Sequence, residues 1–600
     1  FMEAGCDVLE TNTFQSTRLR LEEWGLADQT HAINLAAARL ARGVADRYTA
    51  QDGRPRFVAG SMGPTGKLPS SDDPALSDIT FDELSEVYRE QAVALIEGGV
   101  DVLLVETSVD ILEVKAALDG IRRAKDETGR RDVAVQAQVF LDHPSGRMLL
   151  GTEVPAVIAT LEAMPVDVIG LNCSTGPEDM RDAIRYLGEH SPLPVHCIPN
   201  AGLPLQGPDG ETIFPETPEQ ISAVLGEFVE RHNVGIVGGC CGTTPDHIRA
   251  IAERVAGRVP GQRPAGASTG PRLLVSSMMT ATDLVQEPRP TLVGERVNSQ
   301  GSRKAKELLL ADDYDGLVQI AEDQVTGGAH VLDVCVALTE RADEDEQMRE
   351  VVKRISLTQP APIQIDSTEP EVIEAALEAI PGRAIVNSVN LEAGRDKADR
   401  VIPLARAHGA ALIALTIDEV GMAKTAGRKL EVAQRIVEIA CGEHGLPREA
   451  LIFDALTFTL TTGDEEWRPS AVETIEGIRR IKAEVPGVKT SLGVSNVSFG
   501  VSPPARAVLN SVFLHHCVEA GLDLAMVNPN HITPYGEIPD AERELADDLV
   551  FNRREDALER FIGHFEEKGE EDAAEAADPT EGMEPEEALH WHILRRKKEG

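Results

Sequence analysis

The fold is decided by the run Val234-Gly235-Ile236-Val237-Gly238-Gly239-Cys240-Cys241-Gly242-Thr243-Thr244. The apolar residues Val234 to Val237 suit a buried strand, and the glycines after them suit a loop. Two adjacent cysteines lie in that loop, and Cys173 ends an earlier stretch of the same kind, from Val168. Because the carboxyl ends of barrel strands form one face, we expect the three thiols to meet there.

The first part of the chain, up to about residue 258, alternates short β-branched runs with helix-length segments. This repetition predicts a parallel sheet that is buried on both faces, and most of the predicted strands end in polar or reactive residues. We expect the first strand of an eight-stranded barrel to lie upstream of Phe1, because only seven are visible. The predicted strands are 8–12, 57–61, 100–107, 133–140, 166–173, 195–200 and 234–240.

The same pattern resumes at Thr291 and occurs eight times, as expected of a complete TIM barrel. A doubly wound sheet is the alternative, and the lack of a Gly-x-Gly-x-x-Gly turn disfavours it. We therefore predict an α/β protein with two tandem (β/α)8 TIM barrels, the first lacking its N-terminal strand, plus an acidic C-terminal linker. The predicted strands of the second barrel are 291–298, 331–336, 363–366, 384–390, 411–418, 451–456, 488–496 and 523–530.

Composition sets the predicted boundaries between these units. Pro, Gly, Ala and Ser crowd residues 257–271, which is typical of a linker. Beyond Phe565 the chain becomes acidic and rich in Ala, and residues 584–598 then predict the start of an amphipathic helix. The predicted division is a first domain 1–258, a linker 259–289, a second domain 290–565, and a segment 566–600 holding an acidic linker and the start of that helix.

Charge and cysteine usage exclude several classes of function. A net charge of -42 argues against nucleic acid or an anionic membrane as a partner. We find no run of eighteen apolar residues, and so predict no membrane span. Eight unevenly spaced cysteines in 600 residues do not suggest a disulfide framework. They indicate a cytoplasmic protein with metal-binding or catalytic thiols.

Three thiolates at one strand-end face would leave one position of a tetrahedral zinc ion open. A substrate thiol bound there loses its proton, whereas a free alkyl thiol, with a pKa near ~8.5, stays mostly protonated at neutral pH. The pattern thus predicts activation of a thiol nucleophile. The alternative is that the three cysteines are small buried apolar residues. We interpret the other cysteines in that way: Cys6, Cys197, Cys335, Cys441 and Cys517.

Five motifs of the first domain follow one another along the chain: Glu10-Thr11-Asn12-Thr13-Phe14, Gly60-Ser61-Met62-Gly63-Pro64, Val105-Glu106-Thr107, Gly170-Leu171-Asn172-Cys173 and Gly238-Gly239-Cys240-Cys241-Gly242-Thr243. In these motifs and in their order, the first domain resembles the homocysteine S-methyltransferase family, a family of zinc-dependent TIM barrels that transfer a methyl group to homocysteine. The Asp-Gly-x-x-Gly motif of that family's first strand is absent here.

This resemblance implies a role for each matching residue. The implied zinc ligands are Cys173, Cys240 and Cys241, with Asn200 near the metal when substrate is absent. The residues implied to lie around the amino acid are Asn12, Glu106 and Asn172, with Glu106 meeting its ammonium group.

The second domain offers strand-end carboxylates and amides that can hydrogen-bond a flat nitrogen heterocycle, although a lone strand-end Asp is more often a helix cap. Its motifs are Val293-Gly294-Glu295-Arg296-Val297-Asn298, Gly301-Ser302-Arg303-Lys304, Ile365-Asp366-Ser367, Asn387-Ser388, Phe453-Asp454-Ala455-Leu456 and Gly493-Val494-Ser495-Asn496-Val497-Ser498. These motifs resemble the pterin-binding family, and more closely the methyltetrahydrofolate domain of cobalamin-dependent methionine synthases.

The resemblance implies that Asp366, Asn387 and Asp454 hold the pterin. It places Asn496 near the methyl-bearing nitrogen, where a hydrogen bond would assist the leaving group. The further substrate contacts implied are Glu295, Asn298 and Asp333. The strand after Asp333 departs from the family, with Cys335 and Ala337 where many relatives have Asn and an acidic residue.

Both resemblances occur together, in this order, in the cobalamin-dependent methionine synthase family. They imply methyl transfer from 5-methyltetrahydrofolate through cobalamin to zinc-bound homocysteine, giving methionine and tetrahydrofolate. The cobalamin-binding domain of the full-length protein would then be a partner outside this chain. Two alternatives stay open: a corrinoid-dependent methyltransferase with a separate carrier subunit, and a non-catalytic folate- or homocysteine-binding module. Betaine as methyl donor would leave the second barrel without a role.

Overall fold

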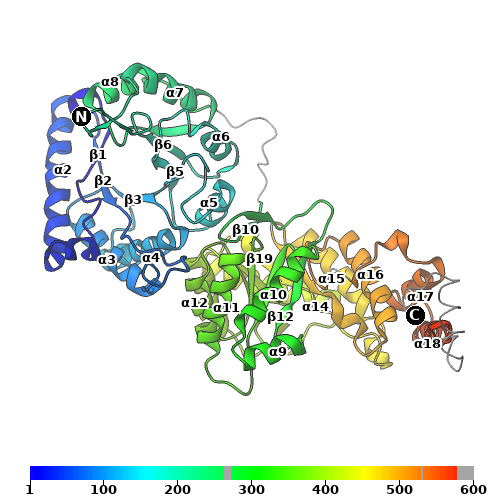
Figure 1. Ribbon diagram of the computed structural model, residues 1–600. Coiled ribbons are helices and arrows are strands. Elements are labelled where there is room, and N and C mark those ends of the chain that lie inside the picture. The colour runs from blue at the N-terminus through cyan, green and yellow to red at the C-terminus, as the bar shows by residue number, and fades with distance from the viewer. Residues whose placement is uncertain (262–271, 529–530, 577–600) are drawn as a thin grey trace, which may run out of the picture.

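The computed structural model describes residues 1–261, 272–528 and 531–576. Two α/β units follow each other along the chain (Figure 1), as the sequence predicts. In both units parallel strands line the centre and helices surround them. The strand-end residues singled out in the sequence therefore lie at defined faces of two separate sheets.

The first unit contains one curled parallel sheet with the order β1-β2-β3-β4-β5-β6-β9. It is open between β1 and β9. All seven predicted strands are confirmed: β1 (Val8–Glu10), β2 (Phe57–Met62), β3 (Val102–Ser108), β4 (Ala134–Val139), β5 (Val168–Cys173), β6 (Val195–Pro199) and β9 (Val234–Val237). A small hairpin, β7 (Leu205–Gln206) and β8 (Thr212–Ile213), follows β6. The helices are α1 (Arg18–Glu22), α2 (Thr30–Asp52), α3 (Phe81–Glu97), α4 (Ile111–Thr128), α5 (Val154–Leu161), α6 (Arg181–His190), α7 (Pro218–Arg231) and α8 (Pro245–Val255).

Local sequence signals start several of these helices. Thr80 and Glu83 form a capping box at the start of α3, and Thr217 and Gln220 form another at α7. Asp110 accepts a hydrogen bond from the backbone N–H of Leu112 and caps α4. These caps satisfy backbone donors that have no partner inside the helix, and they fix where each chain segment turns back onto the sheet.

The second unit is a closed barrel of eight parallel strands, which confirms the predicted TIM barrel. Its strands are β12 (Thr291–Asn298), β13 (Val331–Cys335), β14 (Ile363–Asp366), β15 (Ile385–Val389), β16 (Ala411–Leu415), β19 (Leu451–Asp454), β20 (Lys489–Gly493) and β21 (Leu524–Met526). Asp418 lies not on β16 but in a hairpin of β17 (Ile417–Asp418) and β18 (Gly421–Met422). The helices are α9 (Arg303–Leu310), α10 (Tyr314–Thr326), α11 (Glu344–Thr358), α12 (Pro370–Ala379), α13 (Asp396–Ala407), α14 (Ala426–Val437), α15 (Ser470–Glu484), α16 (Pro503–Glu519) and α17 (Asp540–Val550).

The segment 259–289, expected to be a linker, contains a hairpin of β10 (Leu274–Ser276) and β11 (Ala281–Asp283). Leu273, Val275 and Leu284 are fully buried in this segment. They pack against residues at the amino-terminal ends of the barrel strands, such as Val331 and Leu524. Only the beginning of the segment is rich in Pro, Gly and Ser. The apolar residues of its second half cover the amino-terminal end of the barrel.

Direct contacts join the two units. Lys115 on α4 is buried, and its Nζ donates to the carbonyls of Leu377, Ile380 and Gly382 at 3.4, 2.6 and 3.2 Å. These carbonyls belong to the carboxyl end of α12 and the turn after it, where backbone acceptors lack helical partners. Burial lowers the pKa of Lys115 to about 7. α4 of the first unit and α12 of the second lie side by side at this junction (Figure 1).

Residues 566–576, predicted to begin an acidic linker, belong instead to helix α18 (Ala557–Ala576), and the rest of the predicted linker lies outside the described residues. Ala, Glu and Lys are strong helix formers, so an acidic, Ala-rich composition does not prevent a helix. Phe561 and Phe565 are buried and anchor the first part of α18 to the second unit. The helix expected at residues 584–598 lies outside the described residues.

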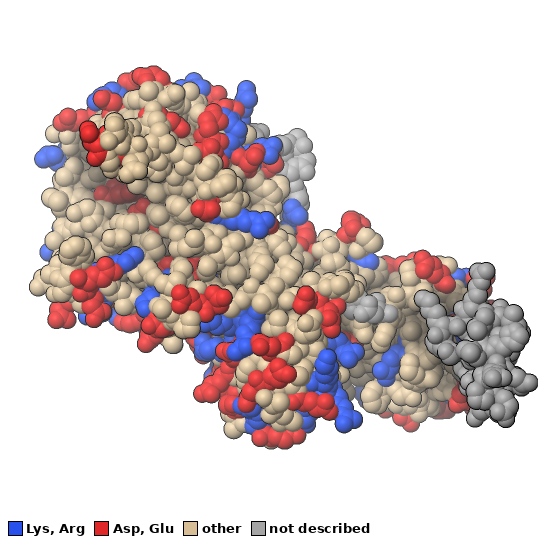
Figure 2. Space-filling view, viewed as in Figure 1, with Lys and Arg blue, Asp and Glu red and all other residues tan. Residues whose placement is uncertain are grey.

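Surface charge is mixed on the face seen in Figure 2, where acidic and basic side chains alternate over both units. Many of the arginines pair with acids of neighbouring helices, such as Arg89 with Glu127 and Arg349 with Glu378. In the described part of the chain, no helix is both long and apolar enough to cross a membrane.

Candidate functional site

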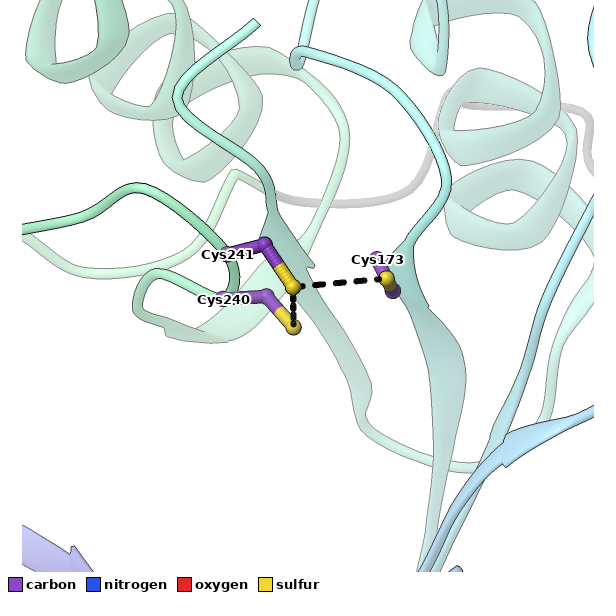
Figure 3. A group of neighbouring side chains, drawn as sticks. All are labelled: Cys173, Cys240 and Cys241. Carbon is purple, nitrogen blue, oxygen red and sulfur yellow. Dashed lines mark hydrogen bonds between the residues drawn. The ribbon is translucent and has the colours of Figure 1, made fainter. Parts of the chain in front are cut away.

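Three cysteines come together at the strand-end face of the first unit: Cys173 at the end of β5, and Cys240 and Cys241 in the loop after β9 (Figure 3). The Cys241 sulfur lies 3.9 Å from that of Cys173 and 3.9 Å from that of Cys240. All three sulfurs fall within 4.8 Å of one another. Cys173 and Cys240 are half-buried and Cys241 is exposed, so the cluster is open to a ligand from solvent.

These distances fit a shared metal ion. A zinc–sulfur bond of about 2.3 Å in a tetrahedral site places ligand sulfurs about 3.8 Å apart. A disulfide would instead require about 2.05 Å between two sulfurs. Three soft thiol donors at this spacing suit zinc and leave a fourth position without a protein ligand.

Backbone conformation and backbone hydrogen bonds set the positions of the three thiols. Cys173 and Ser174 have φ values of 61° and 63°, a region that residues with a side chain rarely adopt. The Asn200 carboxamide oxygen accepts a hydrogen bond from the backbone N–H of Cys241 at 3.1 Å. The backbone N–H of Cys240 donates to the carbonyl of Pro199 at 2.8 Å. The end of β6 therefore holds the loop that carries the cysteine pair.

The three thiols titrate together. The pKa of Cys173 falls to about 3, because the thiols of Cys240 and Cys241 donate hydrogen bonds to its thiolate. Donating to Cys173 raises the pKa of both partners. Hydrogen bonding within the cluster thus favours negative charge on Cys173. A divalent ion would supply the charge needed to keep all three sulfurs ionised.

Glu106 and Asn172 lie at the ends of the strands next to this cluster. Glu106 accepts hydrogen bonds from the Ser61 hydroxyl and, at 3.2 Å, from the Asn172 carboxamide. The Asn172 oxygen accepts from the backbone N–H of Thr107 at 2.8 Å. Glu106 is 7% exposed, and burial raises its pKa. This network fixes a carboxylate near the cysteines.

The second unit has its own cluster at the barrel mouth. Asn298 donates from one amide nitrogen to Asp333 and to Asp366, each at 2.8 Å. The Asn387 side chain lies close enough to Asp333 to act against the rise in the pKa of that carboxyl. Desolvation and then the charge of Asp366 raise the pKa of Asp333 to about 8, and desolvation raises that of Asp366 to about 6. At neutral pH, one proton on Asp333 therefore relieves the repulsion between the two carboxyls.

The remaining residues predicted for this barrel lie around the same mouth but apart from that cluster. Asp454 ends β19 and accepts from the backbone N–H of Leu456 at 2.7 Å, and desolvation raises its pKa to about 6. The Ser495 hydroxyl donates to Glu295 at 3.0 Å. Asn496 is exposed in the 3-10 turn η6 (Val494–Ser498), so its side chain faces solvent.

Comparison with known proteins agrees with the division of the chain into two units. Residues 1–255 match the family described as homocysteine S-methyltransferase, and residues 294–528 match the pterin binding enzymes. The chain joins a homocysteine S-methyltransferase domain to a pterin-binding domain. The cysteine cluster lies in the first of these domains and the Asp-rich mouth in the second.

Two similar proteins are named methionine synthase. The one from Mycobacterium leprae (strain TN) is 42% identical over 574 residues, covering 94% of this chain and 47% of the relative. The one from Mycobacterium tuberculosis (strain ATCC 25618 / H37Rv) is 42% identical over 572 residues, with the same coverage. The chain thus spans about half the length of these relatives. A solved structure, the metallated homocysteine methyltransferase MmuM from Escherichia coli, is 25% identical, covers 42% of this chain and 81% of that chain, and has a TM-score of 0.35.

Within the homocysteine S-methyltransferase domain, Asn12 is exposed just beyond the end of β1. Sequence reasoning passed over Glu10, which stands two residues before it in the same motif. Desolvation and then the charge of Glu106 raise the pKa of Glu10. Its place in the same motif as Asn12 could have indicated this residue.

In the pterin-binding domain, sequence reasoning missed Gln364 and Lys429. Gln364 donates to Asp333 at 2.7 Å, and its position two residues before Asp366 on β14 could have indicated this. Lys429 on α14 is fully buried and donates to the carbonyls of Ala455 and Leu456 behind Asp454. A single lysine in an amphipathic helix gives no sequence signal of such a contact.

Proposed function

We propose that this chain binds homocysteine at the cysteine cluster and 5-methyltetrahydrofolate at the mouth of the second barrel. In the proposed reaction, the methyl group of the folate ends on the homocysteine sulfur, giving methionine and tetrahydrofolate. The observation that supports this most directly is three sulfurs within 4.8 Å at the strand-end face of a homocysteine S-methyltransferase domain. A pterin-binding domain in the same chain supplies a place for the donor.

Cys173, Cys240 and Cys241 would hold zinc, which lowers the pKa of a bound thiol so that it reacts as a thiolate. Asn200 would serve near the metal when no substrate is present, and its hydrogen bond with the backbone N–H of Cys241 supports this role. Cys173 in its left-handed conformation and the loop after β9 orient the three sulfurs toward one point. The three cysteines would thus bind and orient the substrate sulfur through the zinc ion.

The amino-acid end of homocysteine would meet Glu106, Asn172 and Asn12. The Glu106 carboxylate suits an ammonium group, because ionised partners make the stronger hydrogen bonds. Asn172 donates to Glu106 and so keeps that carboxylate in place. Asn12 is exposed at the edge of the sheet, where a ligand can reach it.

In the second barrel, ionised Asp366 and Asp454 would accept hydrogen bonds from the pterin N–H groups, and Asn387 would offer a donor and an acceptor. Asn298 and Asp333 would support Asp366, and Glu295 would support the turn that carries Asn496 through Ser495. Asn496 would hydrogen-bond the nitrogen that loses the methyl group. Such assistance is typically worth ~10²–10⁴-fold in rate.

Cobalamin, bound by a domain outside this chain, would supply the carrier for the methyl group between the two sites. The chain covers 47% of the length of each methionine synthase that it matches, which leaves room for such a domain in those relatives. The residues of this chain would bind and orient the two substrates, each in its own barrel.

Crossed substitutions test the proposal. In Cys240→Ala we expect loss of tightly bound zinc and of homocysteine binding, with 5-methyltetrahydrofolate binding intact. In Asp454→Ala we expect the reverse pattern, with weaker folate binding and unchanged zinc. Zinc after gel filtration and calorimetric titration with each substrate measure these effects.

The matched control is Cys6→Ala, another partly buried cysteine of the first barrel. It should change neither zinc content nor substrate binding. Tightly bound zinc retained in Cys240→Ala would overturn the ligand assignment. Unchanged folate affinity in Asp454→Ala would overturn the pterin assignment.

A further inference from the structure

A second group of metal-ligand side chains lies on α16, far along the chain from the three cysteines. His515, His516 and Glu519 offer one donor atom each, and these atoms fall within 4.8 Å of one another. The His515 Nε2 lies 3.5 Å from one Glu519 carboxylate oxygen, and the His516 Nδ1 lies 3.4 Å from the other. The two imidazoles thus converge on the carboxylate with different ring nitrogens.

The outer ring nitrogen of His516 has a carboxylate partner. Its Nε2 is 2.7 Å from an Asp547 oxygen on α17, and the Tyr535 hydroxyl donates to the other Asp547 oxygen at 2.8 Å. In metal sites, a ligating imidazole usually donates its second N–H to a carboxylate in this way, which fixes the tautomer. Asp547 therefore favours a proton on Nε2. The other ring nitrogen, Nδ1, shares a hydrogen bond with Glu519 at 3.4 Å and is the nitrogen that a metal ion would take over.

The ring of His515 is also held in place. It stacks on Tyr535 with centroids 4.0 Å apart and an angle of 11° between the planes. The side chains of His515 and Glu519 are 35% and 63% exposed, while that of His516 is 13% exposed. The cluster is thus preorganised by its neighbours on one side and open to solvent on the other.

We propose that His515, His516 and Glu519 bind one divalent transition-metal ion, of the kind that imidazole ligands prefer, such as Zn²⁺, Co²⁺ or Ni²⁺. Two imidazoles and one carboxylate are an established zinc donor set that leaves a position for water. Bound metal would also strengthen the packing of α16 against α17, because Asp547 and Tyr535 support the ligands from α17 and the turn before it. The site is independent of the function proposed above, since it shares no residue with it.

Titration of the full chain with Co²⁺ tests the proposal, because the two sites differ in their spectra. Thiolate ligands give an intense charge-transfer band in the near ultraviolet, whereas His and Glu ligands give only weak bands in the visible. We expect wild-type protein to bind two equivalents of Co²⁺. In Cys240→Ala the thiolate band should disappear, while the equivalent bound by the histidines remains. His516→Ala should keep the thiolate band and lose the second equivalent.

The supporting residue provides a finer test. In Asp547→Asn we expect Co²⁺ affinity at this site to fall about 10–100-fold, as is usual for the outer partner of a ligating histidine. His31→Ala is the matched control, because His31 also pairs with a glutamate, at 2.9 Å, but without a second histidine. It should leave both equivalents unchanged.

Two results would overturn the proposal. One is a wild-type chain that binds a single equivalent, with the thiolate spectrum alone. The other is a second equivalent that persists unchanged in His515→Ala and in His516→Ala. Circular dichroism of each variant distinguishes loss of a ligand from loss of the fold.

Discussion

Asp454 and Asp366 combine an acceptor role with a pKa of about 6. Above that pH each carboxyl is ionised and accepts hydrogen bonds, and below it each is protonated and accepts poorly. We therefore predict that affinity for 5-methyltetrahydrofolate weakens as the pH falls below about 6, by up to about tenfold per pH unit for each group. Fluorescence titration between pH 5 and 8 measures this change.

The matched variant is Asp454→Asn, which keeps the shape of the side chain and cannot titrate. Its affinity should depend less steeply on pH than that of the wild type, because only Asp366 still changes charge. An identical slope in both proteins would show that Asp454 does not hold the pterin.

Individual residues differ in how far the sequence alone predicts them. The cysteines were predictable because Cys240 and Cys241 are adjacent and because Cys173 ends a strand of the same sheet. The bridge from Asn298 to Asp333 and Asp366 was not, since it joins residues of three neighbouring strands and depends on their register, which the sequence does not give. The preference for negative charge on Cys173 likewise depends on sulfur distances that no spacing in the sequence gives.

At the scale of elements, the hairpin β10–β11 has a structural role in the second barrel. Leu273 is fully buried against the lower ends of the barrel strands. We predict that Leu273→Ala destabilises this domain by about 2–5 kcal/mol, the usual cost of a large-to-small change in a core. Urea denaturation measures the loss.

The control for this prediction is Leu310→Ala at the end of α9, where the side chain is 43% exposed. It should cost less than about 0.5 kcal/mol, as most surface substitutions do. A similarly small loss in Leu273→Ala would mean that the hairpin is only a connection.

Elements in regular repeats were predicted well, and elements outside the repeats were not. Each barrel strand is a short apolar run with a helix on either side, so its period is visible in the sequence. The hairpin in 259–289 and the extension of α18 to Ala576 were obscured by composition. In both cases Pro, Gly or acidic residues suggested a linker, while a few apolar residues or helix formers determined the structure.

At the scale of the whole molecule, Lys115 ties the two barrels together through three backbone carbonyls. Below pH 7, where Lys115 is mostly protonated, Lys115→Ala should remove about 1.5–3 kcal/mol from the docking of the units, because hydrogen bonds to charged groups have that value. We expect calorimetry to show the unfolding of the two units moving apart in temperature.

Lys125→Ala is the control, since Lys125 lies on the same helix and donates to the Val133 carbonyl within the first unit at 2.6 Å. It should change the unfolding of the first unit without separating the two. If Lys115→Ala leaves the calorimetric profile unchanged, this lysine does not hold the barrels together.

The central claim is that the three cysteines activate the thiol of homocysteine for methylation. The most direct measurement supplies the zinc-loaded chain with homocysteine and free methylcobalamin and follows the formation of methionine. Wild-type protein and Asp454→Ala are predicted to form methionine at similar rates, and Cys240→Ala to form none above the uncatalysed rate. Absence of methionine with the wild type, or equal rates in Cys240→Ala, would contradict the claim.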